Sequence, residues 1–168
     1  ELAAKIGRVK HERGEPIYAP EREERVFAHI AELNAGKLPE AALRAIYREI
    51  ISMSISREEH MLIGYLGPEA TYTHQAARNN FGASLRYQPF PLIADVFAAV
   101  ERGEVHYGVI PIENSSEGGV FHSMDMLAET DLKIVAETYL PIEHCLIGEG
   151  PLEAIEEVAS KDQALGQC

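Results

Sequence analysis

The first 60 residues carry a single pattern, in which apolar side chains recur every three or four positions. Residues 2–9, 26–33 and 43–51 each follow it, and this spacing is typical of the apolar face of an amphipathic helix. Breaks rich in glycine and proline separate the three runs, and Pro20 and Pro39 are suited to opening the second and third helices. The pattern therefore predicts three helices joined by short turns.

The pattern changes after residue 61, where short runs rich in β-branched and aromatic residues alternate with helical ones. The predicted elements are a strand at 62–66, a turn at 67–73, helices at 74–80 and 93–100, strands at 107–112, 132–140 and 143–147, and a short helix at 152–158. Alternation of strands and helices indicates a parallel α/β sheet. We therefore predict a multi-domain α and α/β chain, with a helical domain at 1–59 and an α/β domain at 62–168.

Charge and composition exclude several classes of function. The chain has 168 residues, with 15 Lys and Arg against 27 Asp and Glu and a formal charge of -12, which argues against binding to nucleic acid through its phosphates. No apolar run approaches the roughly 20 residues that span a bilayer, and no secretory signal is visible. No metal-ligand spacing such as HExxH occurs. We expect a cytoplasmic protein with no metal, nucleic-acid or membrane partner.

The first predicted helix begins in the middle of its pattern, without a capping residue before it. We therefore expect that helix to be truncated at its start. Three such short helices bury little surface alone, so a homodimer that pools the apolar faces of two copies is expected.

A small polar cluster is predicted at one end of the helices. Lys10 comes near the end of the first helix, and Arg22 and Glu23 lie in the opening turn of the second. On spacing alone, Lys10 and Arg22 can be solvated surface cations, and Glu23 a residue that the helix dipole favours at this position. Spacing alone favours this interpretation over the alternative, in which the same three residues form the start of a binding site.

Three segments of the helical half resemble the all-helical chorismate mutase domain, which forms helix-exchanged dimers. They are Ile-Gly-Arg-Val-Lys at 6–10, Pro-Ile-Tyr-Ala-Pro-Glu-Arg-Glu at 16–23 and Ile-Tyr-Arg-Glu-Ile-Ile-Ser-Met-Ser at 46–54. The resemblance covers residues 1–59 and implies that five side chains face the substrate: Lys10, Arg22, Glu23, Ser54 and Glu58. The family's further arginines lie upstream of this chain or in a partner subunit, and Ala19 replaces a residue that is often polar.

The chemistry of chorismate explains these residue types. Chorismate is a dicarboxylate that rearranges through a pericyclic transition state, in which the breaking ether oxygen gains negative charge. Cations hold the carboxylates, and hydrogen-bond donors meet the oxygen, so no nucleophile is needed. Lys10 can be such a donor, and Glu58 can be another only when it is protonated.

Two loops of the α/β half are rich in small and polar residues. In residues 67–74 a strand passes into a helix, and free backbone N–H groups there can receive a carboxylate. Thr71 and Thr73 can alternatively be helix caps. Residues 111–119 follow a strand and form either a ligand loop or a plain turn.

Residues 63–168 resemble the prephenate dehydratase family, through Gly-Pro-Glu-Ala-Thr-Tyr-Thr at 67–73, Pro-Ile-Glu-Asn-Ser at 111–115 and the segment from Ser160 to Cys168. The family has a two-lobed fold like that of type 2 periplasmic binding proteins. The resemblance implies one catalytic residue, Asn114, and substrate contacts from Thr71, Thr73, Glu113, Ser115, Ser160 and Gln167. The family's Thr-Arg-Phe motif and regulatory ACT domain lie beyond this chain, and Lys161 and Asp162 replace the usual His-Pro.

Together the two resemblances imply a bifunctional chorismate mutase and prephenate dehydratase on the route to phenylalanine. Its substrates are chorismate and prephenate, and it needs no cofactor. The alternative is a non-catalytic module that binds small acids and carries a helical dimerisation domain, because a fold alone does not fix function.

Overall fold

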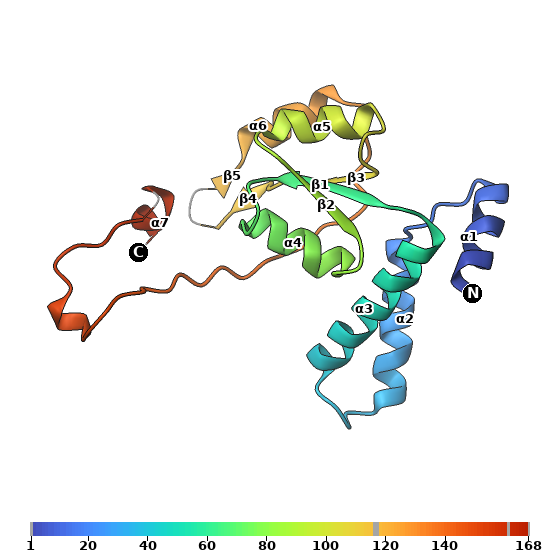
Figure 1. Cartoon of the computed structure of the whole chain (residues 1–168), viewed down its shortest axis with the longest axis horizontal. Helices are drawn as coiled ribbons and strands as arrows, with labels where there is room; N and C mark the ends of the chain where they lie inside the picture. Colours follow the sequence, from blue (N-terminus) through green and yellow to red (C-terminus); the bar gives the residue numbers. More distant parts are fainter. Residues whose placement is uncertain (1, 116–117, 161, 168) are drawn as a thin grey trace.

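The computed structural model describes residues 2–115, 118–160 and 162–167. Its helical half consists of α1 (Leu2–Arg13), α2 (Pro20–Asn34) and α3 (Glu40–Glu58), which confirms the three predicted helices. Figure 1 shows α2 and α3 as an antiparallel hairpin, with α1 beside the end that leads into the sheet. Pro20 opens α2, and a left-handed residue, Ala35, ends it.

The α/β half is built on three parallel strands, as predicted. β1 (Leu62–Leu66) lies between β2 (Arg86–Phe90) and β3 (Tyr107–Val109). Helix α4 (Tyr72–Phe81) covers one face, and α5 (Ile93–Glu101) and α6 (Phe121–Glu129) cover the other (Figure 1). The centre of β1 is buried because helices cover both sides of the sheet.

Strand β2, the short hairpin of β4 (Glu113–Asn114) and β5 (Gly118–Gly119), and helix α6 were not predicted. β2 contains Pro89 and is an edge strand, a position where proline is tolerated. β4 and β5 have two residues each, which is too short for a periodic pattern to show.

The predicted strands at 132–140 and 143–147 and the predicted helix at 152–158 are wrong. Residues 131–151 are extended without regular structure, and only a 3-10 turn, η1 (Leu152–Ala154), and a short helix, α7 (Asp162–Gln167), follow. Figure 1 shows this segment leading away from the sheet. A strand needs a hydrogen-bonded neighbour, and within the described part of the chain this segment has none.

One hydrophobic core joins the two halves. Its buried members come from the turn after α1, from α3, from β1 and the residue before it, and from α4 and the turn that follows: Tyr18, Ile55, Met61, Ile63, Tyr65, Ala77, Phe81 and Leu85. None of the helices described is both long enough and apolar enough to span a membrane.

Candidate functional site

The last turn of α1 and the last residue of α3 meet through an ion pair. Lys10 Nζ lies 2.9 Å from Glu58 Oε2 and also donates a hydrogen bond to the carbonyl oxygen of Ile17 at 3.1 Å. Only 12% of the Lys10 side chain and 9% of the Glu58 side chain are exposed. The two predicted site residues are therefore held together in a partly desolvated position.

Gly7 makes this pairing possible. A Cβ atom at position 7 would lie 2.9 Å from Cα, Cβ and the carbonyl oxygen of Glu58. Because residues three apart share a helix face, the absence of a side chain at Gly7 lets α1 approach α3 closely where Lys10 reaches Glu58. The Ile-Gly-x-x-Lys spacing thus has a packing reason as well as a chemical one.

We expect Gly7→Ala to lower the free energy of unfolding by about 2 kcal/mol, as overpacking does. The gain in helix propensity, at most about 1 kcal/mol, does not offset a clash with backbone atoms. Urea unfolding measures the change. Gly166→Ala, in a helix where nothing lies within 4 Å of the new Cβ, is the control, and equal stabilities of the two variants would contradict the explanation.

Glu23 is buried beside the same cluster and pairs with Arg48 of α3. The Arg48 guanidinium also lies over the ring of Phe27, 4.9 Å from its centroid. Burial raises the pKa of the Glu23 carboxyl, while the hydrogen bond from Arg48 and the charges of Arg48 and Lys10 act in the opposite direction. The sequence prediction missed Arg48, since no spacing rule links residues 23 and 48; its position inside the 46–54 motif was the available signal.

The raised pKa of Glu23 predicts a pH effect on stability. The carboxyl of Glu23 binds its proton more tightly in the folded state than in the unfolded state, where its pKa is about 4.5. The free energy of unfolding therefore falls as pH rises from this value through the raised pKa of the folded state. Relative to Glu23→Gln, which cannot titrate, we expect the parent's free energy of unfolding to decline as pH rises from 4.5 towards neutrality. Urea unfolding at stepped pH measures this difference, and a difference that grows with pH would contradict the prediction.

Arg22 and Ser54 complete the predicted set in the helical half. The Arg22 side chain is exposed and makes no hydrogen bond or ion pair with the residues that the structure describes. Ser54 Oγ donates to the carbonyl oxygen of Ile50 at 2.9 Å, one turn before Glu58 on the same side of α3. The structure thus gathers Lys10, Glu23 and Glu58 by direct contact or electrostatics, and leaves the Arg22 cation solvated.

In the α/β half, Thr71 is the N-cap of α4. Its hydroxyl accepts a hydrogen bond from the backbone N–H of His74 at 3.3 Å and lies within 3.1 Å of two carbonyl oxygens. Thr73 is half-buried in the first turn, and its hydroxyl makes no hydrogen bond within the described part of the chain. The capping interpretation of Thr71 is confirmed, and its contact with a ligand stays a prediction.

His74 lies beside the predicted Thr71 position and was not named as a site residue by the sequence prediction. It is buried, it stacks on Tyr65 with ring centroids 4.5 Å apart, and its Nδ1 accepts the backbone N–H of Ala70 at 3.1 Å. Ala70 has a left-handed φ of 66°, which this hydrogen bond helps to hold. His74 and Thr71 line a shallow hollow of about 400 Å³ at the start of α4.

The loop after β3 lies at the same edge of the sheet as the Thr71 loop, because both follow the carboxyl ends of neighbouring parallel strands. Glu113 and Asn114 form β4, in register with Gly119 and Gly118 of β5. Asn114 is half-buried, whereas Glu113 and Ser115 are exposed. The fold therefore brings the two predicted ligand loops to one edge.

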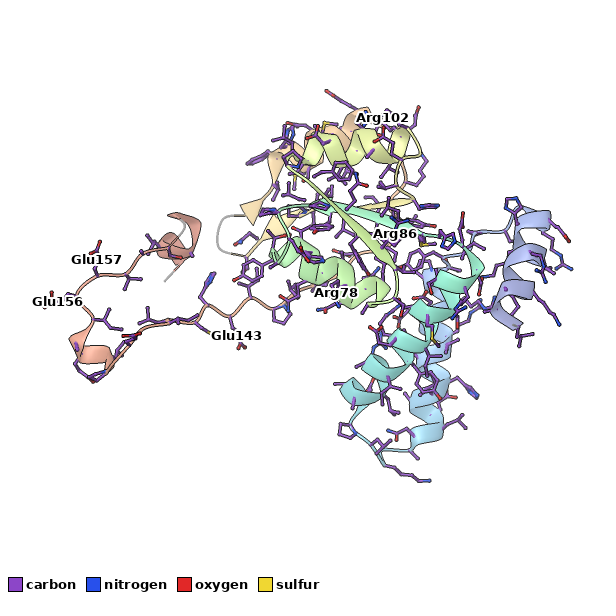
Figure 2. All side chains as sticks on the ribbon, in the orientation of Figure 1. Arg78, Arg86, Arg102, Glu143, Glu156 and Glu157 are labelled. Atoms are coloured by element: carbon purple, nitrogen blue, oxygen red, sulfur yellow. The ribbon has the colours of Figure 1, made fainter. Side chains whose placement is uncertain are left out.

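Ser160 is not brought to this edge. Ser160 is exposed between η1 and α7, and Figure 2 shows Glu156 and Glu157 on the part of the segment farthest from the sheet. The side chain of Gln167 lies outside the described residues. A second hollow, of about 610 Å³, lies between α5, β3 and residues 132–138, and its lining includes none of the predicted site residues.

Comparison with known proteins identifies both halves. Residues 63–168 match the family model described as prephenate dehydratase, and residues 1–59 match the model described as chorismate mutase type II. The bifunctional chorismate mutase/prephenate dehydratase of Aquifex aeolicus is 45% identical over 172 residues, which cover 99% of this chain and 48% of that protein. The protein of the same name from Escherichia coli is 32% identical over 189 residues, covering 100% and 48%.

The chain spans about half the length of these curated relatives. Among solved structures, the prephenate dehydratase of Streptococcus mutans matches with 40% sequence identity and a TM-score of 0.39, covering 40% of this chain and 35% of that one.

Proposed function

Because the chain belongs to the prephenate dehydratase family and carries a type II chorismate mutase region ahead of it, we propose that it acts within a bifunctional enzyme of phenylalanine biosynthesis. The enzyme rearranges chorismate to prephenate and converts prephenate to phenylpyruvate. The observation that carries the proposal is that one chain contains both regions, each with polar side chains close together. They are the ion pairs of Lys10 and Glu23 in the first region and the hairpin that contains Asn114 in the second. The domain limits are 1–59 and 62–168.

The mutase step takes place beside Lys10 and Glu58. The ether C–O bond of chorismate breaks as a C–C bond forms, so no atom enters or leaves. The cations Arg22 and Lys10 bind the two carboxylates and the ether oxygen of chorismate. The remaining polar contacts with the substrate come from Ser54, Glu23 and Glu58. The partly desolvated position of Lys10 supports this role, because charge stabilisation is strongest where water is excluded.

The dehydratase step takes place at the sheet edge that carries the Thr71 and Asn114 loops. Prephenate loses carbon dioxide and hydroxide, and the ring becomes aromatic. Thr71, Thr73, Glu113 and Ser115 bind the substrate, Asn114 is catalytic, and Ser160 and Gln167 approach from the second lobe of a two-lobed fold. Hydrogen bonding to the leaving hydroxyl is enough for this reaction, so no metal or organic cofactor is required.

The test is to supply chorismate to the intact protein and to follow phenylpyruvate. Formation of phenylpyruvate supports both activities, and accumulation of prephenate supports the mutase alone. The alternative, a non-catalytic module that binds small acids, predicts that prephenate binds in calorimetry but is recovered unchanged.

We expect Asn114→Ala to lower the kcat/KM for prephenate by about a hundredfold, the loss typical of removing one donor to developing charge. The mutase activity of the same variant is an internal control and should not change. Phenylpyruvate formation from supplied prephenate measures the effect. A loss below about threefold would show that Asn114 is not catalytic.

The active form is a cytoplasmic homodimer that joins through the helical half. Large apolar side chains remain exposed on α1, α2 and α3: Leu2, Val9, Val26, Leu33, Ile46, Ile50 and Met53. Exposed apolar surface of this kind supports association. Sedimentation equilibrium of the intact protein should give twice the monomer mass, and a monomeric mass would contradict the proposal.

A further inference from the structure

A tyrosine of the helical half is embedded in the α/β half. Tyr18 lies between α1 and α2 and is 4% exposed. Its ring centroid is 4.7 Å from that of Phe81 in α4 and 5.1 Å from that of Tyr107 in β3. Its hydroxyl accepts a hydrogen bond from Asn80 Nδ2 at 2.9 Å. The turn between α1 and α2 is therefore anchored in the other half by packing and by one polar contact.

The anchored turn also holds the lysine of the candidate mutase site. Ile17, directly before Tyr18, offers the carbonyl oxygen that accepts from Lys10 Nζ at 3.1 Å. The surroundings of Tyr18 extend to the same site: burial raises the pKa of its hydroxyl, the Glu23 charge adds to this, and the Arg48 charge opposes it. Tyr18 thus packs against the α/β half, while the residue directly before it binds Lys10 of the mutase cluster.

An ammonium group has three N–H donors. Lys10 gives one to Ile17 and one to Glu58, so the directions of these two fix the direction of the third, which remains for the substrate. A shift of the Ile17 carbonyl would re-aim that donor. Small misplacements of a catalytic group are costly, because the transition state tolerates little deviation in geometry.

We propose that Asn80, a residue of the dehydratase half, is a positioning residue for the mutase site, acting through Tyr18 and Ile17 on Lys10. This inference rests on the proposed mutase function. It assigns the α/β half a part in the first reaction as well as the second.

A second contact between the halves provides a matched control. The carboxylate of Glu49 in α3 accepts the backbone N–H of Ala83 at 2.9 and 3.0 Å. This contact also joins α3 to the end of α4, but it involves neither Lys10 nor the turn that carries Ile17. Loss of it weakens the same junction without re-aiming the lysine.

The experiment compares Asn80→Ala, Tyr18→Phe, the double variant and Glu49→Ala in the intact protein, at a temperature where calorimetry shows every variant to be folded. We expect Asn80→Ala to lower the mutase kcat about tenfold with KM changed less than twofold, because the re-aimed donor acts mainly in the transition state. Tyr18→Phe should have a similar effect, and the double variant should lose no more than either single one. Glu49→Ala should keep the parent's kcat.

Three outcomes overturn the inference. An Asn80→Ala variant with the parent's kcat, or a Glu49→Ala variant with an equal loss, would leave the mutase function standing and remove the positioning role. A parent protein without mutase activity would remove the proposed function itself, and this inference with it.

Discussion

Replacing Lys10 by methionine should lower the mutase kcat/KM about a thousandfold, the upper range for loss of one preorganised donor to developing negative charge. Methionine keeps the unbranched shape of the side chain but has no charge and no N–H group. The partly buried position of Lys10, between Glu58 and the carbonyl oxygen of Ile17, makes solvent a poor substitute. The disappearance of chorismate under steady-state conditions measures the loss.

Two controls separate this effect from misfolding. Lys37→Met removes an exposed lysine in the turn between α2 and α3 and should leave kcat/KM unchanged. Conversion of supplied prephenate by the Lys10→Met protein should also be unchanged, since Lys10 belongs to the other reaction. A Lys10→Met variant that keeps more than a tenth of the parent's kcat/KM would show that Lys10 is not the principal donor.

Replacing Tyr18 by alanine should lower the free energy of unfolding by about 4 kcal/mol, as removal of a buried aromatic ring does. Tyr18 is part of the core that both halves share and contacts rings of α4 and β3. The loss should therefore destabilise both halves together. Chemical unfolding followed by circular dichroism and by mutase and dehydratase activity should show one transition at a lower denaturant concentration.

Tyr72→Ala is the matched control, because Tyr72 is 45% exposed and its hydroxyl makes one exposed contact, to His144 at 3.3 Å. Its removal should cost less than about 1 kcal/mol. If Tyr18→Ala shifts the loss of mutase activity but not the loss of dehydratase activity, the two halves unfold independently and the shared core does not couple them.

Local periodicity was sufficient for the elements whose environment is uniform along their length. The three helices of the first half and the strand at 62–66 were predicted because a single buried face, or burial on both faces, leaves a regular pattern. The pattern failed where the environment depends on a partner. Tyr139 and Ile147 are of residue types that favour strands, yet they are 84% and 92% exposed. No described strand pairs with the segment that contains them.

The candidate sites divide in the same way. Lys10 and Glu58 were predicted as members of one site because both belong to segments that resemble a known family. The structure places the two side chains in contact. Arg48 and His74 were missed because their contacts join different elements of the fold. Arg48 pairs with Glu23, and His74 stacks on Tyr65. Sequence spacing predicts neighbours on one helix, whereas pairs between elements require the tertiary structure.

The link between α3 and β1 is short: Glu59 and His60 are exposed, and the residue next to β1, Met61, is buried. The carbonyl oxygen of Met61 accepts the backbone N–H of Arg86, next to the sheet. Dividing the chain at Met61 would leave two products with exposed apolar surfaces, because the core has members on both sides of this point. The two halves therefore pack as one unit, and a substitution in the shared core affects the stability of both.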